Sequence, residues 1–371
     1  MKKRSGYVWH ERYGWHDTGR GVTFLPWGDY LQPHEHVESA DSKRRFADLV
    51  AVSGLRDELV EIRPRLASEA ELLRFHTPAY LERLRTASLG GGGDAGELTP
   101  FGHGGYDTAR LSAGACIELL EAVWQGRVDN GYALNRPPGH HAEADKGKGF
   151  CLLANGVLAI KHLQALHGAR RVAVVDWDVH HGNSAQGAFY GESSVLTISI
   201  HQDRNFPPDS GHLHENGSGA GLGCNLNIPL PAGSGHEAYL LAFDRVVLPA
   251  LARYRPEIIV VHSGFDASVN DPLGRMMLHS DSYRAMTQRL MAAADTLCAG
   301  KLAMFHEGGY SAAYVPFCGL AVLEELAGVR TAAADPFLPF YRDYPGQLLL
   351  PHQQAVIEQA AALVERIPTT H

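Results

Sequence analysis

The sequence predicts an α/β fold, in which a mainly parallel sheet carries helices on both faces. From about residue 130 onward, short apolar runs alternate with longer segments of helical periodicity, and this order builds parallel sheets. The run at residues 172–175 is largely β-branched and uncharged, which is typical of a strand buried on both sides. No linker-like stretch divides the 371 residues, so we expect a single domain over residues 1–371.

The individual elements follow from periodicity and from capping signals. Strands are predicted over residues 131–134, 171–176, 195–200, 257–262 and 302–305, and helices over 41–50, 109–124, 155–167, 236–253, 280–299, 318–327 and 352–367. Ser68 with Glu71 forms a capping-box pattern, and Thr77 before Pro78 is typical of a helix start. We expect Asp107 to cap the helix that follows it and the glycine run at 90–93 to be a loop.

Residues 1–40 are rich in aromatic residues, glycine and proline, and we expect them to be irregular. Aromatic rings gain stability from burial. This segment is therefore expected to wrap the domain or to contact another subunit, which makes a homo-oligomer the expected assembly. The rings concerned are Tyr7, Trp9, Tyr13, Trp15, Trp27 and Tyr30.

Composition excludes several classes of protein. A net charge of −8 disfavours a nucleic-acid binder held by a basic surface. The five cysteines are widely spaced without a CxxC pair, so neither a disulfide framework nor a thiolate metal site is indicated. The start of the chain has no apolar segment typical of a signal peptide, and no run of about 18 apolar residues occurs. We therefore expect a cytoplasmic protein without nucleic-acid or membrane partners.

Polar clusters follow four of the predicted strands, and strand ends of one parallel sheet lie together in space. Asp176, Asp178 and His180 follow one strand at alternate positions, and Asp266 follows another. Two carboxylates and one imidazole leave a tetrahedral ion one open position, as in catalytic zinc sites. Asp178, His180 and Asp266 are therefore the predicted zinc ligands, one ion per chain. The alternative for the first cluster is a polar surface turn.

The tandem His140 and His141 are candidates for proton transfer, since hydrolysis of an amide needs a base for water and an acid for the amine. Either imidazole could take either role. Asp176 is the expected partner of His140, and Asn183 that of His141. Because Asn183 is neutral, it would raise the pKa of its histidine less than an aspartate would.

A tyrosine and two phenylalanines complete the predicted site. Tyr310 follows Gly308 and Gly309, and its hydroxyl could donate to a developing oxyanion. Phe150, which follows Gly149, and Phe206 each stand in a loop beside glycine or proline, where they could form the walls of a narrow apolar channel. Each ring taken alone is more typical of a hydrophobic core.

Several motifs in the same order resemble the zinc-dependent histone deacetylase family, in its class II and bacterial amidohydrolase-like branch. They span about residues 130–311 and read RPPGHHAE, GFC, DWDVHHGN, SIHQ, FPPDSG, GFDAS, DPLGRMM and EGGYS. The resemblance implies an arginase/deacetylase-like three-layer α/β/α fold with an eight-stranded sheet. It also implies zinc on Asp178, His180 and Asp266, catalysis by His140 and His141, and Tyr310 as the donor to the carbonyl.

The same resemblance implies structural potassium and a substrate channel. One potassium ion would be held in part by main-chain atoms near the zinc, and a second by a neighbouring loop. The residues concerned are Asp176, Asp178, His180, Ser199 and Ile200 for the first ion, Phe189, Glu192 and Val195 for the second, and Gly149, Phe150, Phe206, Leu273 and Gly309 for the substrate.

The leading hypothesis is a hydrolase that removes acetyl or short acyl groups from lysine ε-amines of peptides or proteins. Leu273 favours it, because family members dedicated to acetylated polyamines tend to carry glutamate there. The sequence departs from the family pattern at Ala154, His262 and Ser263 and in the charged segment 143–148. The alternatives are an acetylpolyamine deacetylase, a dimanganese ureohydrolase and a non-catalytic acyl-lysine binding module.

Overall fold

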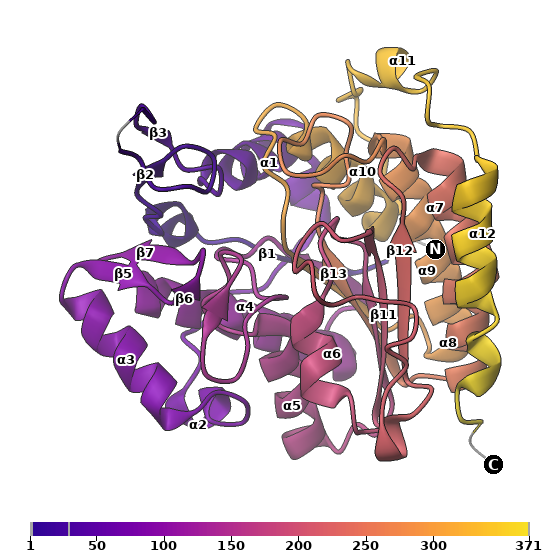
Figure 1. The fold of residues 1–371 in the computed structure, drawn as a ribbon, viewed down its shortest axis with the longest axis horizontal. Coiled ribbons are helices and arrows are strands. Elements are labelled where there is room, and N and C mark those ends of the chain that lie inside the picture. Colours follow the sequence, from indigo (N-terminus) through magenta and orange to yellow (C-terminus); the bar gives the residue numbers. More distant parts are fainter. Residues whose placement is uncertain (1–2, 29, 370–371) are drawn as a thin grey trace.

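A computed structural model describes residues 3–28 and 30–369 of the chain (Figure 1). Its central sheet has eight strands in the order β12-β11-β10-β13-β14-β8-β1-β4, and every neighbouring pair is parallel. The predicted parallel eight-stranded sheet is thus confirmed. The strands are β1 Ser5–Val8, β4 Val60–Glu61, β8 Asn130–Ala133, β10 Val172–Asp176, β11 Val195–Gln202, β12 Asn225–Leu230, β13 Ile258–Ser263 and β14 Leu302–His306.

Helices cover both faces of this sheet and make a three-layer arrangement (Figure 1). The α-helices are α1 Asp41–Val52, α2 Glu69–Leu72, α3 Pro78–Leu89, α4 Gly105–Trp124, α5 Asn155–His167, α6 Asn183–Phe189, α7 His236–Ala242, α8 Leu248–Tyr254, α9 Ser280–Leu297, α10 Val315–Ala327, α11 Leu338–Tyr341 and α12 Pro351–Ala361. Figure 1 shows α4, α5 and α6 on one side of the sheet, and α7, α8, α9 and α12 on the other.

Shorter elements connect these layers. Short strands outside the central sheet are β2 Arg20–Gly21, β3 His34–Glu35, β5 Gly92–Asp94, β6 Gly96–Glu97, β7 Pro100–Gly102 and β9 Gly147–Lys148. Short 3-10 helices are η1 Glu11–Trp15, η2 Leu55–Glu58, η3 Gly219–Gly221 and η5 Val364–Arg366, and η4 Phe243–Val247 is a π-helical turn. Across residues 3–28 and 30–369, no helix combines the length and apolarity needed to span a bilayer.

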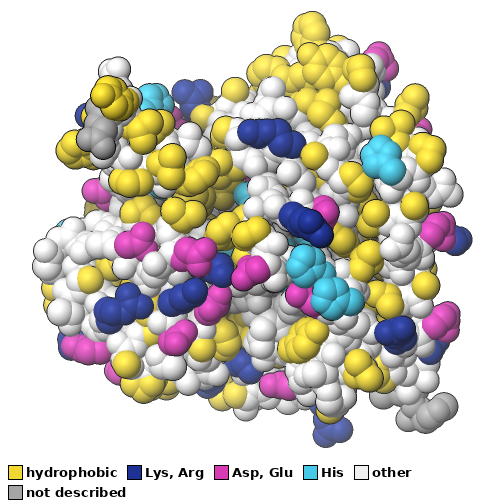
Figure 2. Space-filling view, in the orientation of Figure 1, with side chains coloured by type: hydrophobic (Ala, Val, Ile, Leu, Met, Phe, Trp, Pro, Cys, Tyr) yellow, Lys and Arg dark blue, Asp and Glu magenta, His cyan; other side chains and the backbone are white. Residues whose placement is uncertain are grey.

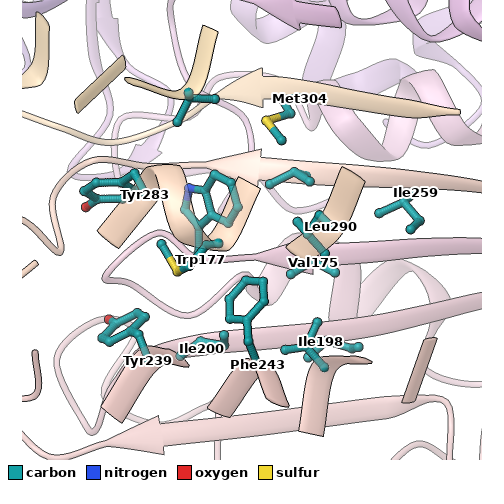
Figure 3. Packing of buried hydrophobic residues seen from close by; sticks show 14 of the residues in the cluster. Val175, Trp177, Ile198, Ile200, Tyr239, Phe243, Ile259, Tyr283, Leu290 and Met304 are labelled. Atoms are coloured by element: carbon teal, nitrogen blue, oxygen red, sulfur yellow. The ribbon is translucent and has the colours of Figure 1, made fainter. Parts of the chain in front are cut away.

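The side chains of β10 alternate between two hydrophobic cores, one on each face of the sheet. Val172 and Val174 belong to the core under α4 and α5, whereas Val175 and Trp177 belong to the core under α7 to α10. Figure 3 shows the second of these cores, in which the buried Trp177 ring lies near the rings of Phe243 and Tyr283. This burial on both faces explains why the strand has no polar residue before Asp176.

Most predicted elements are found within a few residues of their expected limits. The capping box of Ser68 and Glu71 precedes α2, and Thr77 caps α3 with Pro78 in its first turn. Two expectations were wrong. Part of the 90–93 loop pairs as β5, and α4 begins at Gly105 so that Asp107 lies in its first turn rather than capping it. The 236–253 helix is present, with the π-helical turn η4 inside it.

Three strands of the central sheet were not predicted. β1 and β4 have only four and two residues, too few to show a periodicity. β12 reads NLNIPL, and its proline is tolerated because β12 lies at an edge of the sheet. The expectation that residues 1–40 are irregular was therefore wrong for β1, which pairs with β4 and β8.

The aromatic rings of the N-terminal segment differ in burial. Tyr7 and Tyr13 are buried, but Trp15 is 71% exposed and Trp27 60% exposed. Figure 2 shows hydrophobic side chains gathered over the region of β2 and β3, where Tyr30 is also exposed. The expectation that this segment wraps the domain or contacts another subunit stays a prediction for the exposed rings.

Candidate active site

Four loops meet at one edge of the sheet, because β10, β13, β14 and β8 are consecutive neighbours in it. The loop after β8 carries His140 and His141, and the loop after β10 carries Asp178 and His180. The loop after β13 carries Asp266, and that after β14 leads to Tyr310. Parallel pairing therefore brings together residues that are up to 170 positions apart, at the edge where α/β proteins bind ligands.

Asp178, His180 and Asp266 form a buried triad whose ligand atoms lie within 4.8 Å of one another. His180 Nδ1 lies 3.0 Å from Asp178 Oδ1 and 3.1 Å from Asp266 Oδ2. Asp266 Oδ2 is buried, and among the described residues it accepts no hydrogen bond of good geometry. Two buried carboxylates that converge on one imidazole require a cation between them. This donor set therefore fits a zinc ion.

The pKa shifts of the triad also indicate that it needs a positive charge. Burial, followed by the charge of Asp178, raises the pKa of Asp266 to about 6. Burial opposes a charged His180, but the hydrogen bond to Asp178 and the charge of Asp266 outweigh it and raise the pKa of the imidazole to about 10. Without a metal ion, a proton on His180 thus supplies the positive charge that the two carboxylates need.

Backbone groups hold the ligands, and a glycine gives them room. The Gly308 N–H donates to Asp178 Oδ2 at 2.7 Å, and the Val179 N–H donates to Asp266 Oδ1 at 2.8 Å. A Cβ atom at Gly308 would stand 2.0 Å from Asp266 Oδ2, closer than any real contact. Only glycine at position 308 therefore lets the two carboxylates approach each other.

The two histidines are stacked, and each has its own partner. Their ring centroids are 3.9 Å apart. His140 Nδ1 lies 3.0 Å from Asp176 Oδ2, and His141 Nδ1 lies 2.7 Å from Asn183 Oδ1. These are the pairs that the sequence analysis proposed.

Different surroundings give the two imidazoles different charge states. Burial disfavours the charged form of His140, but the carboxylates of Asp178 and Asp176 raise its pKa well above the ordinary value. Burial, together with the neighbouring His140 and His180, lowers the pKa of His141 well below the ordinary value. The surroundings therefore favour the charged form of His140 and the neutral form of His141.

Two supporting residues were missed as contributors by the sequence analysis. Glu307 is buried, and one of its oxygens accepts hydrogen bonds from the N–H groups of Gly139 and His140, at 2.7 and 3.0 Å. His262 lies 3.2 Å from the same Asp176 oxygen that contacts His140. A glutamate placed directly after a buried strand was the available signal for the first, and the departure at position 262 for the second.

Tyr310 is anchored from two sides. Its N–H donates to Asp271 Oδ2 at 2.7 Å, while the preceding Gly309 carbonyl accepts a hydrogen bond from Ser42 Oγ at 2.8 Å. The Lys43 ammonium lies 5.2 Å from the centre of the Tyr310 ring. Burial and the nearby Asp266 raise the pKa of the phenol well above 10, so Tyr310 stays a hydrogen-bond donor. No sequence pattern links residues 42 and 43 to this site.

A narrow channel of about 150 Å³ leads to the triad. The buried His141 and His180 lie at its inner end, and the partly exposed Phe24 marks its outer end. Phe206 packs edge-on against His141 with ring centroids 5.0 Å apart, and Phe150 packs similarly against Tyr310 at 5.8 Å. The complete lining is Phe24, Leu98, His141, Gly149, Phe150, His180, Asn205, Phe206, Leu273 and Tyr310.

Glycines shape the channel as well as the metal site. Gly149 has φ +50°, and a Cβ there would lie 2.6 Å from His141 and 2.7 Å from Phe206. Gly309, with φ +124°, is not part of the channel lining. Its carbonyl is instead the anchor for the Tyr310 loop.

The predicted potassium residues lie at two places on the sheet. Asp176 and Ser199 are direct neighbours across β10 and β11, with Ile200 following in β11. At the second place, the Phe189 carbonyl accepts a hydrogen bond from the Glu192 N–H at 3.0 Å, and Val195 begins β11. The Lys161 ammonium lies 3.8 Å from Glu192, so a cation is already present there. Both potassium sites stay predictions.

Comparison with known proteins finds relatives over most of the chain. Residues 36–326 match the family model described as the histone deacetylase domain. The chain is 49% identical over 366 residues to a histone deacetylase-like amidohydrolase of Pseudomonas aeruginosa, covering 98% of this chain and 96% of that one. A human polyamine deacetylase is 32% identical over 94% of this chain and 54% of its own length. Among solved structures, the HDA15 HD domain superposes with a TM-score of 0.85 at 32% identity, covering 98% and 95% of the two chains.

Proposed function

This chain belongs to the histone deacetylase family, and from that premise we propose that it removes acetyl or short acyl groups from lysine ε-amines with one zinc ion. The observation that supports this most directly is the buried triad of Asp178, His180 and Asp266, of which His180 lines a narrow channel. Beside the triad stand a neutral imidazole and a protonated phenol, and amide hydrolysis needs both groups.

The channel favours acyl-lysine over an acetylated polyamine. Its walls are mainly apolar, and no carboxylate is among the described residues that line it. The aliphatic stem of lysine gains stability from such walls. A polyamine would bring a second ammonium group, and that group would lose hydration without gaining a partner at Leu273. Acetylpolyamine deacetylation is therefore the alternative that a substrate panel decides.

Each residue of the site has its own role in the proposed hydrolysis. Zinc, when bound, lowers the pKa of water to about 7 and polarises a carbonyl. His141 faces the channel, accepts the proton of the attacking water and returns it to the leaving amine. The Tyr310 hydroxyl donates to the acyl oxygen as negative charge develops there. His140, kept charged by Asp176 and Asp178, adds positive potential to the same region.

Replacing Asn183 by aspartate tests the assignment of His141 as the base. A carboxylate 2.7 Å from His141 Nδ1 would stabilise the imidazolium and raise its pKa. Because only the neutral imidazole accepts a proton, the acidic limb of the kcat/KM profile should move to higher pH, by about one to two units. The measurement is the pH profile of Asn183→Asp beside that of Asn205→Asp, which adds the same charge elsewhere in the channel. Equal shifts in both variants would contradict the assignment.

The substrate proposal is tested with zinc-loaded protein on acetyl-lysine peptides, longer acyl-lysine peptides and acetylputrescine. We expect kcat/KM to be higher for an acetyl-lysine peptide than for acetylputrescine. Leu273→Glu should shift the ratio of the two values toward acetylputrescine by about tenfold, because the new carboxylate can pair with the distal ammonium. Leu273→Gln is the control, being similar in size but uncharged.

Two outcomes would count against this reading. Faster turnover of acetylputrescine by the wild-type protein would favour the polyamine alternative. Binding of acyl-lysine without turnover of any substrate, even with zinc loaded, would favour a non-catalytic binding module.

Potassium binding and self-association are two further proposals. We propose that potassium occupies the site beside Asp176 and Ser199, which flame or emission spectrometry of dialysed protein would detect. We also propose that the exposed aromatic residues of the N-terminal segment, among them Trp27 and Tyr30, mediate self-association. Sedimentation of the wild-type protein and of Trp27→Ser tests this, since loss of the assembly is expected in the variant.

A further inference from the structure

Outside the channel, α4 and α5 pack side by side (Figure 1) and bring a second group of metal-ligating side chains together. Glu121 lies near the end of α4, and His162 and His167 lie on α5. His167 Nε2 is 2.7 Å from Glu121 Oε1, and His162 Nε2 is 3.9 Å from Glu121 Oε2. One ligand atom from each of the three residues lies within 4.8 Å of the others. We refer to Glu121, His162 and His167 as the α4–α5 cluster.

One nitrogen of this cluster lacks a partner. His162 is only 4% exposed, and among the described residues its Nε2 has no hydrogen-bond partner. A buried polar atom without a partner costs free energy, and native structures seldom retain one without a reason. The nearest carboxylate oxygen, at 3.9 Å, is too far for a hydrogen bond. Two ligand atoms of a tetrahedral zinc ion lie about 3.3–3.5 Å apart, so the pair must close by about half an ångström for one ion to bind both.

The other nitrogen of the same ring lies between a carboxylate and a guanidinium. His162 Nδ1 lies 3.0 Å from Glu71 Oε1, and a carboxylate behind a ligating histidine orients the ring and strengthens it as a ligand. Arg65 forms hydrogen bonds to both oxygens of Glu71.

Arg74 Nη1 donates a hydrogen bond to the same Nδ1 at 3.1 Å, so without an ion the ring proton is on Nε2. Ion binding requires the other tautomer, in which Arg74 moves away, the proton lies on Nδ1 beside Glu71 Oε1, and the Nε2 lone pair faces Glu121.

We propose that the α4–α5 cluster is a second metal site, which takes a divalent transition-metal ion of the zinc class and joins the two helices. Two imidazoles and one carboxylate suit zinc, copper and nickel, and they leave one position for water. The side chains of Glu121 and His167 are each 21% exposed, so an ion can enter from solvent. Because no residue of the cluster lines the channel, the ion would stabilise the fold without taking part in hydrolysis.

The test is a zinc count on the full-length protein, dialysed against buffered micromolar free zinc. We expect two zinc ions per chain in the wild-type protein and one in His167→Ala. That variant changes a partly exposed side chain at the end of α5, so it should fold and keep its deacetylase activity. His103→Ala, which removes an exposed histidine outside the cluster, should still hold two. In the wild-type protein, added zinc should also raise the Tm after the catalytic site has been filled, and this rise should be absent in His167→Ala.

A variant of the catalytic triad separates this proposal from a dinuclear catalytic centre. Asp178→Asn should lose the catalytic ion and keep the ion of the α4–α5 cluster. Loss of both ions in Asp178→Asn, with both retained in His167→Ala, would place the second ion in the active site and overturn the proposal. A count of one in the wild-type protein would overturn it as well. A second ion that survives in both His167→Ala and His162→Gln would show adventitious binding and have the same consequence. None of these outcomes depends on which substrate the enzyme prefers.

Discussion

Tyr310→Phe is expected to reduce kcat for an acetyl-lysine peptide by about 10²–10³-fold, because removing one donor to a developing oxyanion has an effect of that size. The substitution keeps the ring that packs against Phe150 and under Lys43, and removes only the hydroxyl. KM should change little, since the bonding that is lost belongs to the transition state. Steady-state kinetics on the zinc-loaded variant give both constants.

A matched control is available in Tyr7→Phe. Tyr7 is buried in β1, and its hydroxyl has no hydrogen-bond partner among the described residues. This variant should retain activity close to that of the wild-type protein. Turnover by Tyr310→Phe within tenfold of the wild-type rate, with normal zinc content, would exclude the phenol from the reaction.

Asp178→Asn and Asp176→Asn are expected to differ in zinc content although both lose activity. Asp178 offers its oxygens directly to the ion, so replacing it should weaken zinc binding by 100-fold or more, which is beyond the roughly 10–100-fold effect of changing a residue behind a ligand. Asp176 instead contacts His140 and His262. Asp176→Asn should therefore keep zinc within about that lower range, yet reduce kcat by about 10²-fold or more, because His140 loses its charge.

The comparison requires zinc titrations and kinetics on both variants. The Asp178 N–H donates to Asp176 Oδ1 at 3.0 Å, a bond that asparagine can still accept, so the local turn should survive in Asp176→Asn. Equal loss of zinc in the two variants would show that Asp176 acts as a ligand or as a support for the ligands. Full activity of Asp176→Asn would instead exclude a role for the charge on His140.

Much of the sheet was predictable because each buried strand has a local signature. The runs that became β10, β11, β13 and β14 are apolar, of suitable length and followed by polar residues. β1, β4 and β12 were not predicted. Their pairing depends on neighbours far away in sequence, as when Gly6 of β1 lies between Val60 and Gly131. Short strands of this kind are stabilised by the sheet that they join and not by their own composition.

In the site, too, some features were predictable from the sequence and others were visible only in the structure. Asp178, His180 and Asp266, the histidine pair and Tyr310 were identifiable because each follows a strand in a motif of reactive residue types. The charge states of the two histidines were not, since they depend on burial and on the charges that surround each ring. Likewise, Ser42 and Lys43 reach the Tyr310 loop only through the packing of α1 against α10.

The sequence alone determined the family, the alternation of strands and helices, and the residue types that converge at the strand ends. These are local properties, which can be recognised from the periodicity of apolar residues and from the order of the motifs. The tertiary structure decided which imidazole favours the charged form, that Asp271 accepts from the Tyr310 N–H and Glu307 from the Gly139 N–H, and that Glu121 meets two histidines of the neighbouring helix. Each of these outcomes depends on the distance and dielectric between groups that the chain connects only through space.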